Sequence, residues 1–372
     1  MQKIKVLQVV SKMGNGGIEK FLMNLYSHID RNKVEFAFVV HTKEEQIYDK
    51  LILEYGGKIL RVPRFKLYNI IGYIISWFKL FRENNDYKLM HCHMVSVASI
   101  YITISKFFNI TSIVHSHSTR SDVGAIRYLK SAFQYPIRFL ANYKFACSSE
   151  AGIALFGKRK SFTKIPNAIN TEEYMFNQTI RDNYKTLFNL KDKFIIGHVG
   201  RINPTKRQDF IIDIMDYIVN KKKIYDYHFV SVGNGSLIDK LITKVERLNL
   251  NNHVTFLGYR DDISNIMQMF DMIIFPSLYE GFPVTLIESQ CSGLNALISS
   301  HLTRDVNLTS LIKRVDIEEK AAVWGNEALK LKMTNNRENY YEIVKSKGFD
   351  IKQLADILAR FYTDKELPTY DF

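Results

Sequence analysis

Two glutamates eight residues apart, Glu280 and Glu288, mark the segment of this sequence whose residue types are most specific for chemistry. Pro283 lies between them and favours the first turn of a helix, which places Glu288 one to two turns into that helix. The free backbone N–H groups at the helix start, near Val284 and Thr285, can receive an anion. The two carboxylates can bind separated hydroxyl groups of one ligand, and an exposed pair of salt-bridged carboxylates is the alternative.

A basic loop is the second candidate for ligand chemistry. Gly200 follows a predicted strand, Arg201 comes next, and Lys206 stands at the start of the following helix. Arginine can grip phosphate oxygens with two hydrogen bonds, and lysine supplies a point charge. The loop therefore predicts a phosphate site, with a solvated basic loop as the alternative.

A glycine-rich turn follows the first predicted strand, with Gly14, Gly16 and Gly17 opening a helix. Glycine lets backbone N–H groups approach a phosphate closely at a helix start, although a tight turn without a ligand has the same composition. The spacing is not G-x-G-x-x-G, and the second predicted strand ends in His41-Thr42 without an acidic residue for a ribose. Both observations argue against a dinucleotide oxidoreductase.

Two His-x-His pairs, His91 with His93 and His115 with His117, each end a predicted strand. Residues two apart in a strand point to the same side of a sheet. Imidazoles from neighbouring strands could therefore combine into a zinc site. No carboxylate stands at ligand spacing, so we favour the interpretation that some of these histidines pack at strand ends and one hydrogen-bonds a substrate.

The elements that must position these residues alternate along the chain. The predicted strands cover residues 4–10, 34–41, 58–62, 88–92, 111–116, 143–147, 194–199, 227–232, 253–257, 271–275 and 296–299. The predicted helices cover residues 18–29, 44–55, 66–84, 94–107, 123–139, 148–156, 207–220, 236–247, 261–269 and 283–291. Because parallel strands require a crossover, this α/β alternation predicts two doubly wound domains facing each other across a cleft, with a hinge at 166–170.

The composition is that of a folded globular protein: 372 residues, of which 46% are apolar and 24% charged. Three distant cysteines, Cys92, Cys147 and Cys291, exclude a disulfide scaffold and are typical of a reducing compartment. The sequence has no signal peptide and no run of 18 apolar residues, so we expect a cytoplasmic protein.

The excess of basic over acidic residues lies entirely in the first half of the chain. Residues 1–165 hold 25 basic and 11 acidic residues, whereas residues 166–372 hold 26 basic and 27 acidic residues. This asymmetry predicts an anionic partner for the first half, such as a membrane surface, a phosphate-bearing substrate or a nucleic acid.

Together these residues resemble the retaining glycosyltransferases of family four (group 1), which have the GT-B fold of two Rossmann-like domains. The similarity covers nearly the whole chain and is greatest to members that build bacterial capsular polysaccharide or exopolysaccharide. The matching motifs are Gly14-x-Gly16-Gly17-x-Glu19, His115-x-His117, Pro166-Asn167, Gly200-Arg201 with Lys206, Phe256-Leu257-Gly258, and Glu280-Gly281-Phe282-Pro283 through Glu288.

The resemblance implies roles for individual residues. Arg201 and Lys206 would hold the donor diphosphate and stabilise the leaving group. Glu280 would lie beside the transferred sugar, and His117 would complete the catalytic set. The implied donor-binding residues are Gly16, Gly17, Gly200, Phe282, Val284, Thr285 and Glu288, the last on the ribose hydroxyl groups. Acceptor binding is assigned to His115 and Asn15.

The resemblance also implies domain roles and a mechanism. Residues 1–165 would bind the acceptor, residues 166–348 the nucleotide sugar, and residues 349–372 would form a helix crossing back to the first domain. The sequence has no D-x-D triplet, so we expect no metal and no cofactor. Basic side chains and a helix start would supply the charge, and attack on the front face would retain the anomeric configuration.

The expected reaction moves a hexose or N-acetylhexosamine from a nucleotide sugar, in our interpretation a UDP-sugar, to a lipid-diphosphate-linked saccharide. We expect a peripheral protein on the inner face of the plasma membrane that binds no nucleic acid, and the sequence leaves its oligomeric state open. The alternatives are a nucleotide-sugar epimerase of GT-B fold, a nucleic-acid-binding protein, and a metal hydrolase built on the histidine pairs. Gly293-Leu294-Asn295 departs from the family's usual Gly-x-Pro, which leaves the donor sugar open.

Overall fold

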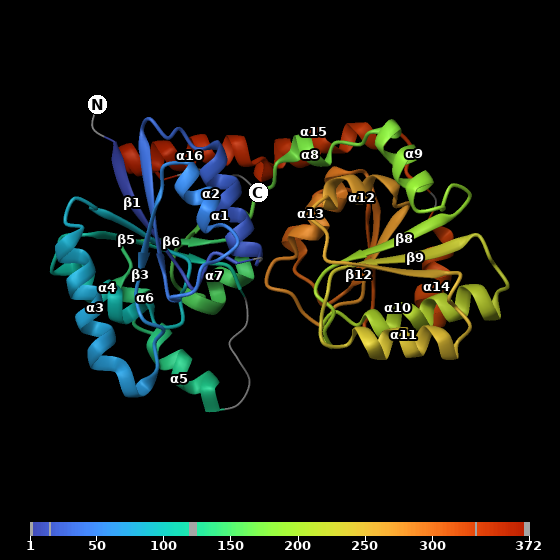
Figure 1. The fold of residues 1–372 in the computed structure, drawn as a ribbon, viewed down its shortest axis with the longest axis horizontal. Coiled ribbons are helices and arrows are strands. Elements are labelled where there is room, and N and C mark those ends of the chain that lie inside the picture. The colour runs from blue at the N-terminus through green and yellow to red at the C-terminus, as the bar shows by residue number, and fades with distance from the viewer. Residues whose placement is uncertain (1–2, 15, 119–124, 332, 368–372) are drawn as a thin grey trace. The chain divides into compact units, whose positions relative to one another are not determined.

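The structure of the chain is a computed structural model that describes residues 3–14, 16–118, 125–331 and 333–367 (Figure 1). By its internal contacts the chain divides into two compact units. Unit 1 comprises Met1–Ile169 with Asp350–Phe372, and unit 2 comprises Asn170–Phe349. The predicted boundaries lay after residues 165 and 348.

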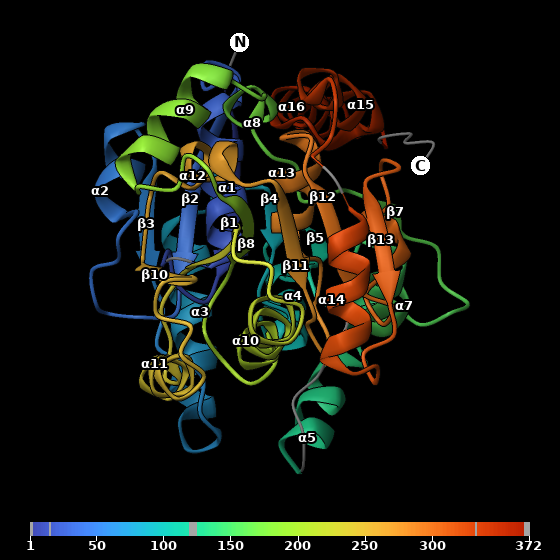
Figure 2. The same cartoon turned by 90° about the vertical axis from the view of Figure 1, so that its right-hand side faces the viewer.

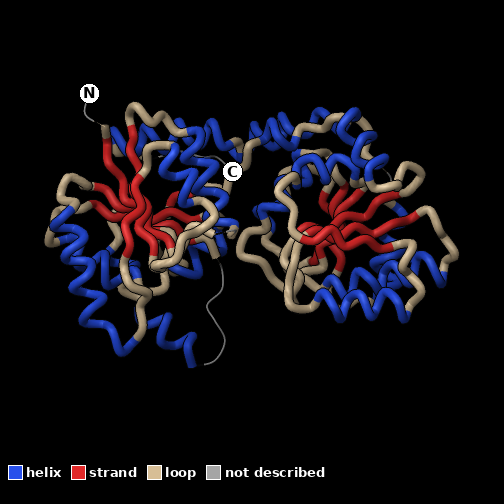
Figure 3. The backbone as a smooth tube through the Cα atoms, viewed as in Figure 1, coloured by secondary structure: helices blue, strands red, loops and turns tan. Residues whose placement is uncertain are grey.

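Unit 1 is built on a parallel sheet of seven strands in the order β3-β2-β1-β4-β5-β6-β7. Its strands are β1 (Ile4–Val10), β2 (Val34–Val40), β3 (Lys58–Arg61), β4 (Leu89–Cys92), β5 (Thr111–Ser116), β6 (Tyr143–Ala146) and β7 (Thr163–Lys164). The chain order reverses between β1 and β4, and at such a switch point the loops diverge at the carboxyl ends of the strands. Helices cover both faces of this sheet, as Figure 3 shows for each unit.

The helices of unit 1 fall into two layers. They are α1 (Gly17–His28), α2 (Asp49–Glu54), η1 (Leu67–Asn69), α3 (Ile70–Glu83), α4 (Ala98–Lys106), α5 (Ala125–Gln134), α6 (Ile137–Leu140), α7 (Ser149–Phe156) and α16 (Ile351–Asp364). The C-terminal α16 packs on α1 and β1, and its buried Leu354, Leu358 and Tyr362 share one core with Phe21 of α1. Helix α3 packs on α4 in the other layer.

Unit 2 repeats the same winding in six strands, in the order β10-β9-β8-β11-β12-β13. Its strands are β8 (Phe194–Val199), β9 (Tyr227–Val232), β10 (Val254–Gly258), β11 (Met272–Phe275), β12 (Asn295–Ser299) and β13 (Ile312–Val315). Its helices are α8 (Thr171–Tyr174), α9 (Gln178–Leu187), α10 (Gln208–Asp216), η2 (Tyr217–Lys221), α11 (Ile238–Arg247), α12 (Ile263–Met269), α13 (Val284–Cys291), η3 (Arg304–Val306), α14 (Ala321–Lys330), η4 (Arg337–Asn339), α15 (Tyr340–Val344) and η5 (Lys345–Phe349). Helices α10, α11 and α14 pack together on one face, and α8, α9, α12, α13 and α15 lie on the other (Figure 2).

The predicted fold class is confirmed, because both units are doubly wound α/β sheets, and the differences lie in short or broken elements. The single helix predicted for 123–139 is two helices, since Pro136 lacks the N–H that would continue α5 and instead caps α6. Only Asp49–Glu54 of the helix predicted for 44–55 forms. The strands β7 and β13 and the helices α9 and α14 were not predicted.

Candidate active site

In unit 2 the predicted phosphate and sugar residues lie in the loops that follow β8 and β11, the two strands at the switch point. Lys206 and Glu280, from the two different loops, form an ion pair. Their side chains are 18% and 13% exposed, so the pair is shielded but reachable. The structure therefore brings together one cation and one carboxylate that lie 74 residues apart in sequence.

A turn at Asn203 holds Lys206 in place. The Asn203 carboxamide oxygen accepts hydrogen bonds from the backbone N–H groups of Thr205 and Lys206, at 3.0 and 3.1 Å. Leu278, in the loop after β11, donates its N–H to the Thr205 carbonyl at 2.9 Å, which ties the two loops together. The Lys206 ammonium also lies over the ring of Phe275, 5.1 Å from its centroid. An anion entering this site would find the cation already positioned.

Arg201 lies at the surface of the same loop. Its side chain is exposed, and within the described ranges no hydrogen bond or ion pair holds its guanidinium. Beneath it, the buried His198 sets the loop: its Nδ1 lies 2.9 Å from the Ile274 carbonyl, and its Nε2 lies 3.2 Å from the Gln208 amide. Burial lowers the pKa of His198 to about 4, so the ring that positions the loop is neutral. Arg201, which is exposed, is available to an anion.

Glu288 faces inward. Its side chain is buried, and one carboxylate oxygen accepts a hydrogen bond from the Tyr174 hydroxyl at 2.7 Å. Tyr174 lies on α8, in a segment for which the sequence analysis predicted no element, so this partner was missed. This hydrogen bond fixes the orientation of the buried Glu288 carboxylate, which does not lie on the solvent-exposed side of α13.

The start of α13 offers backbone donors beside these side chains. Val284 and Thr285 occupy its first turn, and the N-cap residue is Pro283, which makes no side-chain capping bond. The first N–H groups of a helix have no partner within it, so they can bind an anion. Phe282, placed in the donor site by the resemblance, is buried and stacks on Phe349, with ring centroids 5.9 Å apart.

The loops after β8 and β9 meet backbone to backbone through two glycines that the sequence analysis did not single out. A Cβ at Gly233 would lie 2.2 Å from the carbonyl oxygen of Gly200, and one at Gly235 would lie 1.8 Å from that of Ile202. The φ angle of +127° at Gly233 also disfavours any other residue. The signal was in the sequence, as a Gly-Asn-Gly that directly follows a predicted strand, and Gly200 has a packing role because of it.

In unit 1 the glycine-rich turn leads into α1 as predicted. Gly16 is the N-cap of the helix and Gly17 its first residue. The Glu19 side chain lies against Gly16, where a Cβ would come within 2.1 Å of the carboxylate, while a Cβ at Gly17 would meet no atom of the described residues within 4 Å. Gly17 is therefore the open position at this helix start. Asn15, assigned to acceptor binding, lies outside the described residues.

The four histidines of the two pairs gather at the carboxyl ends of β4 and β5. His93 and His117 line a pocket of about 230 Å³ together with residues of the loops after β1 and β4. The Nε2 of His117 lies 2.8 Å from the Nδ1 of His93, and its Nδ1 lies 2.9 Å from the Asn167 carboxamide oxygen. His115, assigned to acceptor binding, is completely buried and does not line this pocket.

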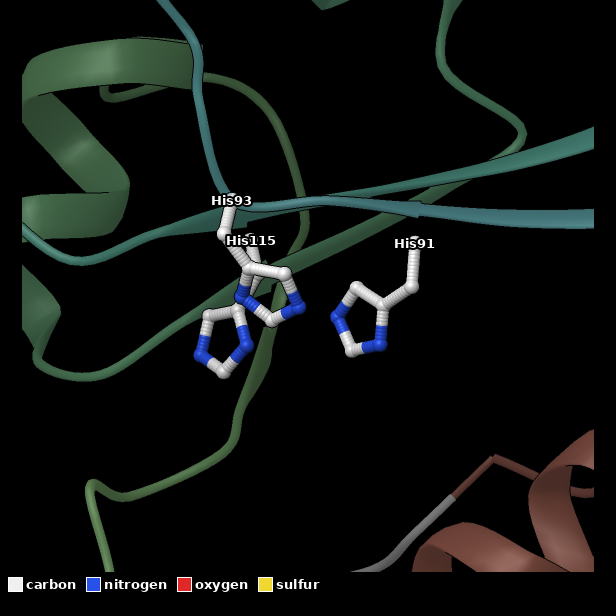
Figure 4. Close-up of side chains that lie close together, drawn as sticks. All are labelled: His91, His93 and His115. Atoms are coloured by element: carbon white, nitrogen blue, oxygen red, sulfur yellow. The ribbon is translucent and has the colours of Figure 1, made fainter. Parts of the chain in front are cut away.

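Burial keeps these imidazoles neutral. Loss of solvation lowers the pKa of His117 to about 4 and holds the pKa values of His91, His93 and His115 well below their usual range. Neutral imidazoles offer lone pairs, and one ring nitrogen of each of His91, His93 and His115 lies within 4.8 Å of the others (Figure 4). Of the described residues, these are the ones whose arrangement could hold a metal ion.

Comparison with known proteins identifies the family of this chain. Residues 180–309 match the family described as Glycosyl transferases group 1. EpsF of Bacillus subtilis (strain 168), named as a glycosyltransferase, is 30% identical over 370 residues, which cover 96% of each chain. The UDP-Gal:alpha-D-GlcNAc-diphosphoundecaprenol alpha-1,3-galactosyltransferase of Escherichia coli is 26% identical over 61% of each chain.

Among solved structures, Alr3699/HepE from Anabaena in complex with UDP superimposes with a TM-score of 0.78 at 16% identity, covering 96% of this chain and 99% of that one. At this identity the likeness concerns the fold, which is GT-B, with two doubly wound units. The sequence match to EpsF extends over the same length. The chain therefore belongs to the group 1 glycosyltransferases.

Proposed function

We propose that this glycosyltransferase transfers a hexose or N-acetylhexosamine from a UDP-sugar, with retention of configuration and without a metal ion, to a lipid-diphosphate-linked saccharide in capsule or exopolysaccharide synthesis. One observation carries the proposal: the Lys206–Glu280 ion pair lies in the two loops at the switch point of unit 2. Arg201 and the start of α13 belong to the same pair of loops. Such a set can bind a diphosphate and a sugar at once.

In the proposed mechanism the leaving diphosphate gains negative charge as the glycosidic bond breaks. Lys206 and Arg201 stabilise that charge, together with the first N–H groups of α13, because preorganised charges and dipoles favour the transition state over the ground state. Binding of the diphosphate draws Lys206 away from Glu280, and the freed carboxylate then faces the sugar. Glu288, oriented by Tyr174, accepts hydrogen bonds from the ribose hydroxyl groups.

The donor assignment to UDP is supported by two similar proteins, a galactosyltransferase named for UDP-Gal and a GT-B structure that holds UDP. Saturation-transfer NMR against a panel of UDP- and GDP-sugars tests it, with Glu288→Gln as the control that keeps the fold and loses ribose contacts. We expect transfer of saturation to a UDP-sugar. Signals from GDP-sugars alone would contradict the donor proposal, and release of an epimerised sugar nucleotide without acceptor would contradict the transferase proposal.

A basic groove in unit 1 supports an anionic, lipid-linked acceptor. The groove has a volume of about 1150 Å³ and adjoins the histidine pocket through shared lining residues such as Ser11 and Met94. Its lining includes one acidic residue, Glu44, and five basic residues, which are Lys12, Lys43, Arg64, Lys66 and Lys130. The basic side chains would bind the diphosphate of a lipid-linked acceptor, and the apolar side chains at the rim would contact its lipid.

The rim of this groove is the surface that we propose to dock on the inner face of the plasma membrane. Leu67 and Tyr68 of η1 are 59% and 82% exposed, and Ile71 and Ile75 of α3 are 73% and 61% exposed. Helix α3 buries Tyr73 and other residues of its opposite side, so packing on the sheet accounts for only part of its apolar surface. No helix within the described ranges is long and apolar enough to cross a membrane.

Vesicle flotation tests the docking. Exposed apolar side chains beside lysine and arginine suit the interface of an anionic bilayer, where each cation contributes about 1 kcal/mol. We expect binding to vesicles that contain phosphatidylglycerol to increase with its fraction and to decrease with added salt. Equal binding to neutral and anionic vesicles, or no binding to either, would contradict the docking and favour a soluble acceptor.

A further inference from the structure

Three buried imidazoles meet on one side of the unit 1 sheet, where β4 and β5 end (Figure 4). The register pairs His91 with Ile113, which brings His93 of one strand beside His115 of the next. Imidazole nitrogen is a preferred ligand of zinc, copper and nickel ions. We propose that His91, His93 and His115 form a buried site for such a transition-metal ion, with Zn²⁺ as the test ion.

Each of the three rings turns one nitrogen toward an oxygen atom of the protein. The pairs are His91 Nδ1 with the Tyr362 hydroxyl at 2.7 Å, His93 Nε2 with the Gln8 carboxamide oxygen at 3.0 Å, and His115 Nε2 with the Ile165 carbonyl at 3.2 Å. Metal-binding histidines characteristically donate their second N–H to such an oxygen, which fixes the ring and leaves the other nitrogen for the ion. The outer contacts of a metal site are thus in place.

Two of the ring nitrogens that do not face these oxygen atoms make no hydrogen bond within the described part of the chain. His91 Nε2 and His115 Nδ1 are buried without a hydrogen-bond partner among the described residues. Because the Ile165 carbonyl can only accept, His115 carries its proton on Nε2 and presents a lone pair at Nδ1. A buried acceptor left unsatisfied costs about 1–3 kcal/mol. A bound cation would satisfy His115 Nδ1, and it would also satisfy His91 Nε2 in the tautomer in which His91 Nδ1–H donates to the Tyr362 hydroxyl.

The dimensions require only a small closing movement. The ligand nitrogens lie within 4.8 Å of one another, and a tetrahedral ion with Zn–N distances of about 2.1 Å needs them about 3.4 Å apart. His93 would bind through Nδ1 and give up its hydrogen bond to His117. His117 Nε2 is then the nearest candidate for the fourth ligand, since it lies 2.8 Å from that nitrogen.

The competing interpretation is a metal-free network of neutral imidazoles. Reversing the Gln8 carboxamide would let it donate to His93, which could then donate to His117. That network leaves His91 Nε2 and His115 Nδ1 without partners in either orientation, so it does not account for them. The site goes beyond the proposed function, and its ion would join β4, β5 and, through Tyr362, α16.

The test measures metal content without any activity assay. The full chain, free of a polyhistidine tag, is dialysed against Zn²⁺ and then against buffer, and bound zinc is measured by mass spectrometry. We expect ~1 equivalent per chain, and a tetrahedral absorption spectrum when Co²⁺ replaces Zn²⁺. His115→Gln should remove at least nine-tenths of the bound metal. His228→Gln, which changes a buried histidine of unit 2, is the matched control and should retain it.

A second variant keeps the test informative if the His115→Gln chain does not fold. Tyr362→Phe removes only the hydroxyl behind His91 and should weaken zinc affinity about tenfold or more, the usual effect of losing an outer partner. Circular dichroism verifies that each variant is folded. Zinc content below a tenth of an equivalent in the folded parent chain, or equal zinc content in the parent and His115→Gln chains, would overturn the proposal and leave the neutral network.

Discussion

The two units share one winding but differ at the edge where ligands bind. Where β4 and β5 end in unit 1 the groups are neutral imidazoles, packed against one another and against Phe21, and the basic groove lies beside them. At the equivalent edge of unit 2 they are charged, with the Lys206–Glu280 pair beside the exposed Arg201. The same scaffold therefore supports both a desolvated, uncharged cluster and a charged pair at the ends of its strands. What distinguishes the two sites is the set of side chains at the last strand residues and in the loops that follow them, since the order of the first six strands is the same.

The largest difference should be in acid stability. Burial lowers the pKa of His41 and His117 to about 4, and it holds the pKa values of His91, His93 and His115 well below their usual range. Below about pH 6.5 the unfolded chain takes up protons that the folded unit does not, so the free energy of unfolding falls as the pH drops from about 6.5 toward 4. Each group contributes about 1.4 kcal/mol per unit of pKa difference.

Two buried tryptophans report the two units separately, Trp77 in unit 1 and Trp324 in unit 2. Urea unfolding of Trp324→Phe and Trp77→Phe chains, at pH 7.5 and pH 5 with EDTA present, isolates each signal. We expect the Trp77 transition to lose several kcal/mol and the Trp324 transition to lose less, because unit 2 has two such histidines, His198 and His228. Equal losses would show that the contrast between the edges does not extend to stability.

Next in size is the loss of charge at the unit 2 edge. Arg201→Ala and Lys206→Ala should each cost about 3 kcal/mol or more of transition-state stabilisation, a decrease of about 10²–10³-fold in turnover. Lys240→Ala, which removes an exposed lysine of the same unit, should have no effect. Turnover that disappears in EDTA and returns with Mg²⁺ or Mn²⁺ would replace these side chains by a metal as the source of charge.

Replacing Glu280 or Glu288 should decrease activity less, with one change acting mainly on turnover and the other mainly on donor binding. Glu288→Gln should raise the dissociation constant of the donor roughly tenfold or more, and Tyr174→Phe should do so by less, since it removes one hydrogen bond to a charged group. Glu280→Gln should lower turnover more than binding. Calorimetric titration with the donor and initial rates separate these effects. Parental rates in both glutamate variants, with unchanged melting, would refute the assignment of this edge.

The smallest effect concerns the basic surface of unit 1. Replacing Arg64 and Lys66 by glutamine should weaken binding to anionic vesicles by about 1 kcal/mol for each residue, because they flank the exposed Leu67 and Tyr68. The matched control is Lys240→Gln, an exposed lysine of the unit with almost no net charge. Vesicle sedimentation at two salt concentrations measures both. Equal weakening by the control would mean that position does not matter and only total charge does.

The sequence predicted the fold better than the site, for a physical reason. Hydrophobic periodicity repeats along each strand and helix, so most long elements were predicted, with the ten-residue helices α9 and α14 as exceptions, whereas the two-residue β7 carries too little pattern. The Lys206–Glu280 pair was predictable residue by residue, because a basic residue and a carboxylate follow recognisable strands. The Tyr174–Glu288 hydrogen bond was not, since it joins residues 114 apart and neither neighbourhood encodes the other.

The histidine cluster illustrates the same limit. Alternation places His91 with His93, and His115 with His117, on one side of the sheet. Only the strand register shows that His93 lies beside His115, and only the packing of α16 shows that His91 meets Tyr362, 271 residues later in the chain. The sequence analysis therefore named these histidines but gave the acceptor role to His115, which the structure buries.

The position of α16 has a consequence for biosynthesis. Unit 1 begins the chain, yet its core includes Leu354, Leu358 and Phe361, so the ribosome delivers its last apolar face only after all of unit 2 has been made. Unit 2 is contiguous and can complete its core first, although it is second in order. A chain truncated after residue 349 should therefore lose unit 1 to a protease while unit 2 survives. Unit 1 therefore begins the chain but can complete its core only after the last residues have been synthesised.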